Sequence, residues 1–333
     1  MRIAVNTRLL LKDKLEGIGW YTYETLIRIV KAHPEHEFYF LFDRPYHQEF
    51  IFASNVHPVL VNLPTRHPIL WYAWFELILP KILRKLQIDL FLSPDGFLSL
   101  RSNIPSIAVI HDINFEHHPR DLKKSHSLFY RHFFRKYAHK AERIVTVSEY
   151  SKNDLANLYS VSKNKIDVSL NGVNPNFHPI GTSQQIEVKN QYSNGHDYFL
   201  FVGALHPRKN IKRMLQAFDV FKEETKSTNK LLIVGAKMWW NAELKSSFEN
   251  LNHKADIIFT GRKSVAELQL LYASAQAFCF VPYFEGFGIP ILEAMKCGCP
   301  VITSNCTAMP EVAGDSALLV DPYKVASIAA AFI

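Results

Sequence analysis

Cysteine is scarce in this sequence and confined to its last part. Four cysteines occur among 333 residues, at positions 279, 297, 299 and 306. Disulfide-stabilised secreted domains spread an even framework of cysteines along the chain, so we expect free thiols and a reducing, cytoplasmic compartment. A zinc site needs two well-spaced ligand pairs. Cys297 and Cys299 flank a single residue, and no histidine cluster follows them. The sequence therefore predicts no metal site.

Long apolar runs are also missing. The longest candidate for a membrane span, Pro68 to Pro80, has 13 residues and contains Glu76. Crossing a bilayer takes about 20 apolar residues, so we expect no transmembrane helix. The first ten residues begin directly with a strand-like run, without the apolar core and cleavage site of a signal peptide.

Two common phosphate-binding signatures do not occur. Neither Gly203-Ala204-Leu205 nor Gly235-Ala236-Lys237 extends to G-x-G-x-x-G, and there is no G-x-x-x-x-G-K-[ST]. These absences disfavour dinucleotide-dependent dehydrogenases and P-loop nucleotidases.

Positive charge is concentrated in the first half. The whole chain has 38 basic and 31 acidic side chains, and residues 1–180 hold 23 and 17 of them, a net of +6 out of +7. A basic surface attracts anionic partners such as lipid headgroups or phosphate. Ordinary solubility charge is the other interpretation.

Short apolar runs bounded by turn residues recur along the chain. Several are continuous rather than alternating, which is typical of strands buried on both faces of a parallel sheet. The runs are Ile3–Asn6, Phe38–Phe42, Val59–Leu63, Asp89–Leu92, Ile107–Ile110, Ile144–Val147, Ile166–Leu170, Tyr198–Val202, Lys230–Val234, Ile257–Thr260, Ala277–Val281, Pro300–Ser304 and Ala317–Val320. Segments with helical spacing lie between them, at Tyr21–Val30, Leu122–Lys140, 210–224, 241–252, 264–274 and 290–297.

This alternation predicts an α/β protein with two doubly wound, Rossmann-like parallel-sheet domains that face each other across a cleft. We expect the first domain at residues 1–175 and the second at 197–333. The segment 176–196 is rich in Asn, Ser and Gln and is predicted to be a linker. Ligands of such domains bind at the carboxyl ends of the strands.

A basic turn follows the first predicted strand of the second domain. Gly203 permits a tight turn after the strand, and Arg208 and Lys209 come just before a predicted helix. Two cations beside a helix N-terminus favour a diphosphate site. A solvated basic helix start is the simpler interpretation.

A glycine-rich loop with two carboxylates follows the predicted strand at 277–281. Glu285 lies in the loop, and Glu293 lies inside the helix that Pro290 opens. A carboxylate is a good acceptor for vicinal hydroxyl groups, so one can hold a sugar and the other a ribose. A surface glutamate and a helix glutamate are the alternative.

Three features of the first half are weaker signals. Gly17 and Gly19 form a glycine loop before a predicted helix at 20–30, able to approach a phosphate or an acceptor closely. His111 ends a predicted strand and can hydrogen-bond a substrate. The segment 123–143 is a basic amphipathic helix whose aromatic stripe, Phe129, Phe133 and Tyr137, belongs either to the core or to a membrane contact.

Together these stretches resemble the retaining glycosyltransferases of family 4, also called glycosyl transferase group 1, which have the GT-B fold. In the second half the resemblance is carried by Gly203, Arg208-Lys209-Asn210, Glu285 to Ala294, Pro310 to Asp315 and Ala317 to Pro322. In the first half it is carried by Glu16-Gly17-Ile18-Gly19, Ile110-His111-Asp112, Val147 to Ser151 and Asn171-Gly172-Val173.

The resemblance implies metal-independent, retaining transfer of a hexosyl group, such as mannosyl, from a nucleotide diphosphate sugar. The acceptor would be a glycan or a lipid-linked glycan in bacterial surface polysaccharide synthesis. The basic first half adds the expectation of a peripheral contact with an anionic inner membrane, and no nucleic acid partner is expected.

Residue roles follow from the same resemblance. Glu285 and His111 would hold the donor sugar, Glu293 the ribose, and Arg208 with Lys209 the departing diphosphate. Donor contacts are also implied for Gly203, Gly286, Phe287, Gly288 and Ile289. Gly17 and Gly19 would form the loop near the diphosphate and the acceptor.

The chain departs from the family pattern in places. Ala204 stands where many relatives have arginine, which leaves the diphosphate to Arg208 and Lys209. The second domain is expected to lack the family's terminal helices. A sugar-nucleotide epimerase of the same fold and a degenerate sugar-nucleotide-binding protein remain alternatives. The donor base, the sugar, the acceptor, the linkage and the oligomeric state are left open.

Overall fold

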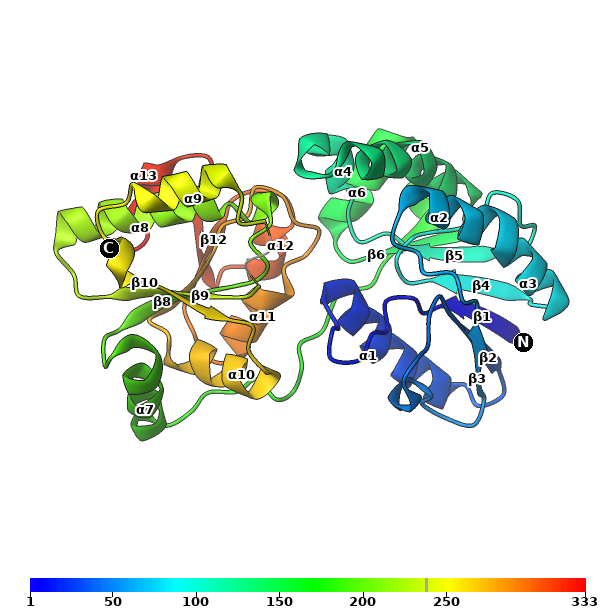
Figure 1. Ribbon diagram of the computed structural model, residues 1–333, viewed down its shortest axis with the longest axis horizontal. Coiled ribbons are helices and arrows are strands. Elements are labelled where there is room, and N and C mark those ends of the chain that lie inside the picture. Colours follow the sequence, from blue (N-terminus) through cyan, green and yellow to red (C-terminus); the bar gives the residue numbers. More distant parts are fainter. Residues whose placement is uncertain (237–238) are drawn as a thin grey trace. The chain divides into compact units, whose positions relative to one another are not determined.

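The chain forms two compact units, each built on one parallel sheet. Figure 1 shows the computed structural model, which describes residues 1–236 and 239–333. The units are Met1–Asn171 and Gly172–Ile333. The predicted α/β class with two parallel sheets is confirmed.

Seven strands form the sheet of the first unit, in the order β3-β2-β1-β4-β5-β6-β7, and every neighbouring pair is parallel. The strands are β1 (Arg2–Asn6), β2 (Glu37–Phe42), β3 (Val56–Leu60), β4 (Leu90–Ser93), β5 (Ser106–Val109), β6 (Arg143–Thr146) and β7 (Ile166–Val168). Strand β3 lies three residues before its predicted position. It contains Pro58, which an edge strand tolerates. The prediction started the strand after this proline, at the apolar run, and so placed it too late in the sequence.

Helices cover both faces of this sheet (Figure 1). They are α1 (Gly17–Ala32), α2 (Pro68–Tyr72), α3 (Leu79–Lys85), α4 (Asn114–His117), α5 (Lys124–Lys140) and α6 (Glu149–Tyr159), and a π-helical turn, Ala73–Ile78, joins α2 to α3. Short 3-10 turns lie at Gln48–Phe50, Pro119–Asp121 and Lys163–Lys165. Successive strand residues point to opposite faces. Val5 and Phe40 therefore pack with Leu26 of α1, whereas Ala4 and Leu41 belong to the core under α2 and α5.

The amphipathic helix predicted at 123–143 is α5, and its aromatic stripe is mostly core. Phe129 and Tyr137 are buried, and Phe133 packs against the same cluster. The apolar run that begins at Pro68 forms the helical segment from α2 to α3. No helix in the described part of the chain is long and apolar enough to span a membrane.

Six parallel strands form the sheet of the second unit, in the order β10-β9-β8-β11-β12-β13. They are β8 (Tyr198–Val202), β9 (Lys230–Val234), β10 (Ile257–Gly261), β11 (Ala277–Phe280), β12 (Val301–Ser304) and β13 (Ala317–Val320). The helices are α7 (Thr182–Ser193), α8 (Ile211–Thr225), α9 (Ala242–Glu249), α10 (Val265–Ser274), α11 (Ile289–Lys296), α12 (Met309–Ala313) and α13 (Val325–Ala330), with 3-10 turns at Pro207–Lys209 and Lys254–Asp256.

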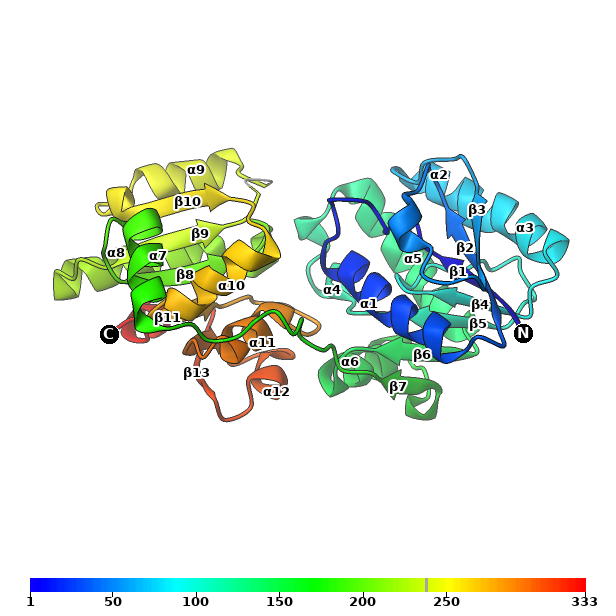
Figure 2. The same ribbon diagram turned by 90° about the horizontal axis from the view of Figure 1, so that it is seen from below.

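The segment predicted as a linker, 176–196, contains helix α7 and belongs to the second unit. Helix α7 lies beside α10 (Figure 2), where the Gln185 side-chain amide donates a hydrogen bond to the Ala273 carbonyl at 2.9 Å. The polar composition of the segment does not predict this helix. Tertiary contacts with α10, and not a local apolar pattern, stabilise it.

Two glycines bring strands β8 and β9 close together at their carboxyl ends. Gly203 and Gly235 have φ angles of +151° and +147°. The Gly203 N–H donates to the Val234 carbonyl at 2.9 Å. A Cβ atom at Gly235 would lie 2.0 Å from the Gly203 carbonyl oxygen. The turn that follows β8 therefore requires a residue without a side chain, glycine, at position 235.

We expect Gly235→Ala to destabilise the second unit by about 2 kcal/mol or more, because the new methyl group collides with backbone at a strained φ angle. Urea-induced unfolding measures the effect. Gly172→Ala is the matched control, since nothing lies within 4 Å of its added Cβ. Equal stability of the two variants would contradict this account of the turn.

Candidate active site

The loops after β8 and β11 bring two cations and one carboxylate together at the carboxyl edge of the second sheet. The Lys209 Nζ lies 2.5 Å from Glu285 Oε1, and the Arg208 Nε lies 3.4 Å from the same oxygen. Glu285 is 7% exposed. The Lys209 Nζ also lies 4.6 Å from the centre of the Phe280 ring. Strand β8 pairs with β11, so loops that are distant in the sequence meet at this edge.

Asn210 fastens the basic turn to two other loops. Its backbone has φ +61°, a left-handed conformation that asparagine tolerates better than most residues. Its buried side-chain amide donates to the Val281 carbonyl at 3.0 Å and to the Pro322 carbonyl at 2.7 Å. The Arg208 carbonyl in turn accepts from the Tyr283 N–H at 3.0 Å. The sequence prediction did not include Asn210 among the site residues, because its partners are 71 and 112 residues away.

The glycine-rich loop leads directly into helix α11. Gly288 has φ +104° and precedes the helix, and a Cβ there would lie 3.0 Å from the Met309 Cε. Pro290 occupies the first turn, where its missing N–H is not needed. The N–H groups at the start of a helix point away from the helix and favour an anion. Phe287 is 7% exposed and anchors the loop in the core.

Glu293 lies inside α11 and is partly buried. The hydroxyl of fully buried Tyr272 donates a hydrogen bond to Glu293 Oε2 at 2.9 Å. Burial raises the pKa of Glu293 to about 7, although the Tyr272 hydrogen bond acts in the opposite direction. Sequence reasoning missed Tyr272, since nothing in its helical position on α10 indicates a partner on another helix.

In the first unit, His111 follows β5 at the carboxyl edge of the sheet. Its Nε2 lies 2.9 Å from the Pro94 carbonyl oxygen, which only accepts, so Nε2 carries the proton of this hydrogen bond. Burial lowers the pKa of His111, and the ring is neutral at pH 7. The Nδ1 atom therefore has a lone pair and can accept a hydrogen bond. The Tyr21 ring packs edge-on against His111, with 4.8 Å between ring centres.

Gly17 and Gly19 lie in the first turn of α1, and the prediction of a loop at these positions is wrong. Glycine is a poor helix former, but packing decides here. A Cβ at Gly19 would lie 3.0 Å from the Leu9 carbonyl oxygen, so the preceding loop runs close against the helix. Nothing lies within 4 Å of a Cβ at Gly17. One turn later, Tyr21 reaches His111. The structure thus connects α1 with His111 inside the first unit.

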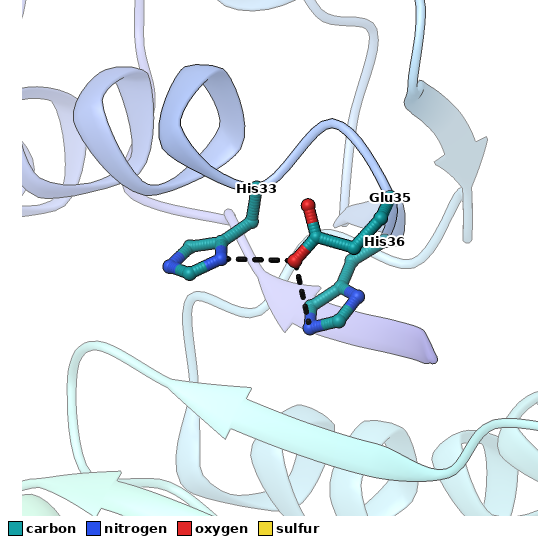
Figure 3. A group of neighbouring side chains, drawn as sticks. All are labelled: His33, Glu35 and His36. Carbon is teal, nitrogen blue, oxygen red and sulfur yellow. Dashed lines mark hydrogen bonds and ion pairs between the residues drawn. The ribbon is translucent and has the colours of Figure 1, made fainter.

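Potential metal ligands occur elsewhere in this unit. Among residues 1–236 and 239–333, the group with at least three such ligands is His33, Glu35 and His36 (Figure 3). They lie on the loop before β2, at the amino edge of the sheet, opposite His111. The side chains of His33 and Glu35 are 53% and 59% exposed. This exposed group takes no part in the candidate site.

The four cysteines are free thiols, as the sequence predicts. Burial raises the pKa of Cys297 to about 11 and of Cys299 to about 12, and it also raises the pKa of Cys279 and Cys306. Thiols with raised pKa values are poor nucleophiles and poor metal ligands at neutral pH.

Comparison with known proteins assigns both units to one family. Residues 15–177 match the profile described as "Glycosyltransferase Family 4", and residues 183–333 match "Glycosyl transferases group 1". The O-antigen chain mannosyltransferase B of Escherichia coli is 29% identical, over 96% of this chain and 87% of its own length. The O-antigen chain mannosyltransferase RfbU of Salmonella typhimurium is 28% identical, over 77% of this chain and 67% of its own length.

A solved structure of similar fold is Anabaena HepE in complex with UDP and glucose. It superposes with a TM-score of 0.73 at 17% identity, over 98% of this chain and 88% of that one. The two parallel sheets, the glycine-rich loop with Glu285, and the matches over both units lead to one conclusion: the chain is a glycosyltransferase of group 1 and has the GT-B fold.

Proposed function

We propose that the chain transfers a hexosyl group, mannosyl in the first instance, from a nucleoside diphosphate sugar to a glycan or lipid-linked acceptor of a bacterial surface polysaccharide. Relatives named as O-antigen mannosyltransferases support the sugar and the acceptor class. The observation that carries the proposal is the contact of Lys209 and Arg208 with the buried carboxylate of Glu285.

The two cations serve the leaving group. In retaining transfer the bond between C1 of the sugar and the phosphate oxygen breaks, and its electron pair stays on the phosphate. The acceptor hydroxyl forms the new bond to C1 on the same face and gives its proton to that phosphate oxygen. Negative charge grows on the diphosphate, so Lys209, Arg208 and the first N–H groups of α11 stabilise the transition state more than the ground state. Fixed cations supply this charge, and we propose that no metal ion is required.

Glu285 has two roles in this proposal. Before the donor binds, it pairs with Lys209 and holds the ammonium group at the strand edge. With the donor bound, the diphosphate replaces the carboxylate as the partner of Lys209, and Glu285 accepts hydrogen bonds from hydroxyls of the sugar. Donor contacts by the backbone of Gly203 and of the 286–289 loop complete the donor site of the second unit.

Glu293 and His111 act as hydrogen-bond acceptors in this proposal, and Gly17 leaves room for a ligand. Glu293 holds the ribose diol through its carboxylate. His111 is neutral, and its Nδ1 accepts from a substrate hydroxyl, since its Nε2 proton is committed to Pro94. Gly17 leaves open space at the start of α1 for a phosphate or an acceptor.

We expect Lys209→Ala and Glu285→Gln each to lower kcat by about a hundredfold or more, as the loss of one transition-state contact does. Transfer is assayed in the presence of EDTA, and circular dichroism confirms the fold. Lys212→Ala is the matched control. Lys212 lies three residues after Lys209 in the sequence but pairs with Glu243 on the surface. Full transfer by both variants would refute the assignment. Conversion of the donor without an acceptor would identify an epimerase instead.

We also expect donor binding to depend on the protonation of Glu293. With a pKa of about 7, the carboxylate gains a proton as the pH falls, and affinity for the nucleotide decreases by up to about tenfold per pH unit below 7. The same raised pKa means that the contribution of Glu293 to stability is present below its unfolded value of 4.5 and is lost as the pH rises towards 7. Calorimetric titration between pH 5.5 and about 8 measures the affinity.

Glu293→Gln is the control for that titration. The diphosphate also titrates, but it does so equally with both proteins, so the difference between their pH profiles reports Glu293. Parallel profiles for the wild type and the variant would contradict the assigned role.

We further propose a peripheral contact of the first unit with the anionic cytoplasmic leaflet. Helices α2 and α5 adjoin, with 5.2 Å between the ring centres of Trp71 and Phe129. The segment from α2 to α3, together with α5, presents the exposed apolar side chains Ile69, Tyr72, Leu77 and Leu128. The same segments carry exposed cations at Lys81, Arg84, Lys85, Lys124, Arg131, Arg135, Lys136 and Lys140. Apolar groups among basic ones suit a surface of acidic lipids.

We expect Leu128→Glu to weaken binding to phosphatidylglycerol vesicles about tenfold, because it removes an exposed leucine that would insert into the lipid surface and adds repulsion from the acidic headgroups. Co-sedimentation with vesicles measures the effect. Leu170→Glu is the control, since Leu170 is also exposed but lies outside these helices. Equal binding to vesicles of neutral phosphatidylcholine, or binding that does not fall with rising salt, would overturn the membrane contact.

A further inference from the structure

A buried carboxylate in the first unit gathers four hydrogen-bond donors. Asp95 is 8% exposed and follows strand β4. Its Oδ1 accepts from the side chains of Asn6 at 2.7 Å and Ser93 at 3.0 Å and from the Phe97 N–H at 3.3 Å, and its Oδ2 accepts from the Arg8 Nε at 2.6 Å. Asn6 ends β1 and Ser93 ends β4, so this network joins two adjacent strands at their carboxyl ends.

Arg8 is held as firmly as Asp95. Its side chain is 7% exposed, and its guanidinium carbon lies 4.1 Å from the centre of the Phe97 ring and 5.3 Å from that of Phe75. A second guanidinium nitrogen donates to the Thr65 hydroxyl at 3.3 Å. A buried ion pair loses so much solvation that it contributes little to stability compared with apolar side chains. Stability alone therefore does not explain why this ion pair is present. Its position beside the turn at Pro94 suggests a different reason.

The residue between Ser93 and Asp95 is Pro94, whose carbonyl accepts the Nε2–H of His111 at 2.9 Å. The Gly96 N–H donates to the Ser93 carbonyl at 3.2 Å and closes the turn. Gly96 has φ +80°, and a Cβ there would lie 3.0 Å from Phe134 Cε1 and 3.2 Å from the Val109 carbonyl oxygen. The direction of the Pro94 carbonyl is therefore fixed from both sides.

This carbonyl decides which nitrogen of His111 carries the proton. A neutral imidazole has one N–H and one lone pair, and the hydrogen bond of one nitrogen sets the role of the other. The backbone carbonyl of His111 accepts a hydrogen bond from the Ser151 hydroxyl at 3.0 Å, a contact that does not involve the imidazole. The Tyr21 ring lies edge-on and limits the tilt of the imidazole.

We propose that Arg8 and Asp95 are positioning residues for His111: they hold the Pro94 carbonyl against Nε2 and thereby keep the lone pair on Nδ1. The use of that lone pair for a substrate hydroxyl rests on the proposed function, whereas the tautomer itself does not. Two buried residues thus determine which hydrogen bond His111 offers to a substrate.

The tautomer is read directly by NMR of the imidazole nitrogens. Long-range proton–nitrogen correlation spectra of the full chain are recorded for the wild type, Asp95→Asn and Ser93→Ala, and the His111 signals are identified by their loss in His111→Asn. We expect only the Nε2-protonated form in the wild type. In Asp95→Asn we expect a mixture of both forms, and in Ser93→Ala a smaller change in the same direction.

Glu76→Gln is the matched control. Glu76 is another buried carboxylate of this unit, and it accepts from the Leu100 N–H at 3.0 Å without touching the Pro94 turn. It should leave the His111 tautomer unchanged. If Asp95→Asn does not fold, Ser93→Ala and Arg8→Lys carry the test, since each keeps the Asp95 carboxylate in place. An unchanged tautomer in the folded variants overturns the inference.

Activity separates this inference from the proposed function. A shifted tautomer together with a lowered kcat supports both. A shifted tautomer with full transfer activity supports the positioning role of Asp95 and contradicts the role of His111 in transfer.

Discussion

The contact between Lys209 and Glu285 is the constraint on which the candidate site depends. These residues are far apart in the sequence, and they meet because β8 and β11 are neighbours in a parallel sheet whose carboxyl ends share one edge. Asn210 then joins the turn before α8 to the loops after β11 and β13. The apolar strands thus determine where the charges meet, and a single amide fixes how they are oriented.

Both units place a buried ion pair at the carboxyl edge of their sheet, and in both the pair is hard to explain by stability alone. Removing two charges from water is costly, and a protein with well-packed apolar side chains in place of a buried ion pair is often equally stable. In the proposed function the diphosphate of a donor would give Lys209 a new partner, so that the pair would be exchanged when the donor binds. In the first unit Arg8 and Asp95 stay paired, and their effect passes through a backbone carbonyl to His111. On these two proposals, the Lys209–Glu285 pair serves donor binding and the Arg8–Asp95 pair serves the orientation of His111.

Local sequence patterns predicted much of this fold. Strands β8, β9 and β13 lie where continuous apolar runs placed them, and Glu285 lies in a loop as its glycines indicate. Local patterns could not predict the contacts between segments that are distant in the sequence. The hydrogen bond of Tyr272 to Glu293 joins two helices, and the Leu9 carbonyl lies close against Gly19 in the first turn of α1. Helix α7 was missed for the same reason, since α10 stabilises a polar segment.

The central claim is that Lys209 binds the diphosphate of the donor. A double-mutant cycle tests it most directly, with the affinities of the wild type and of Lys209→Ala for a nucleoside diphosphate and for its nucleoside, using whichever of GDP, UDP and ADP stabilises the chain most. The account predicts a coupling energy of about 1.5–3 kcal/mol between the lysine and the diphosphate. A coupling energy near zero, in which Lys209→Ala changes the affinity for the diphosphate no more than the affinity for the nucleoside, would contradict this claim.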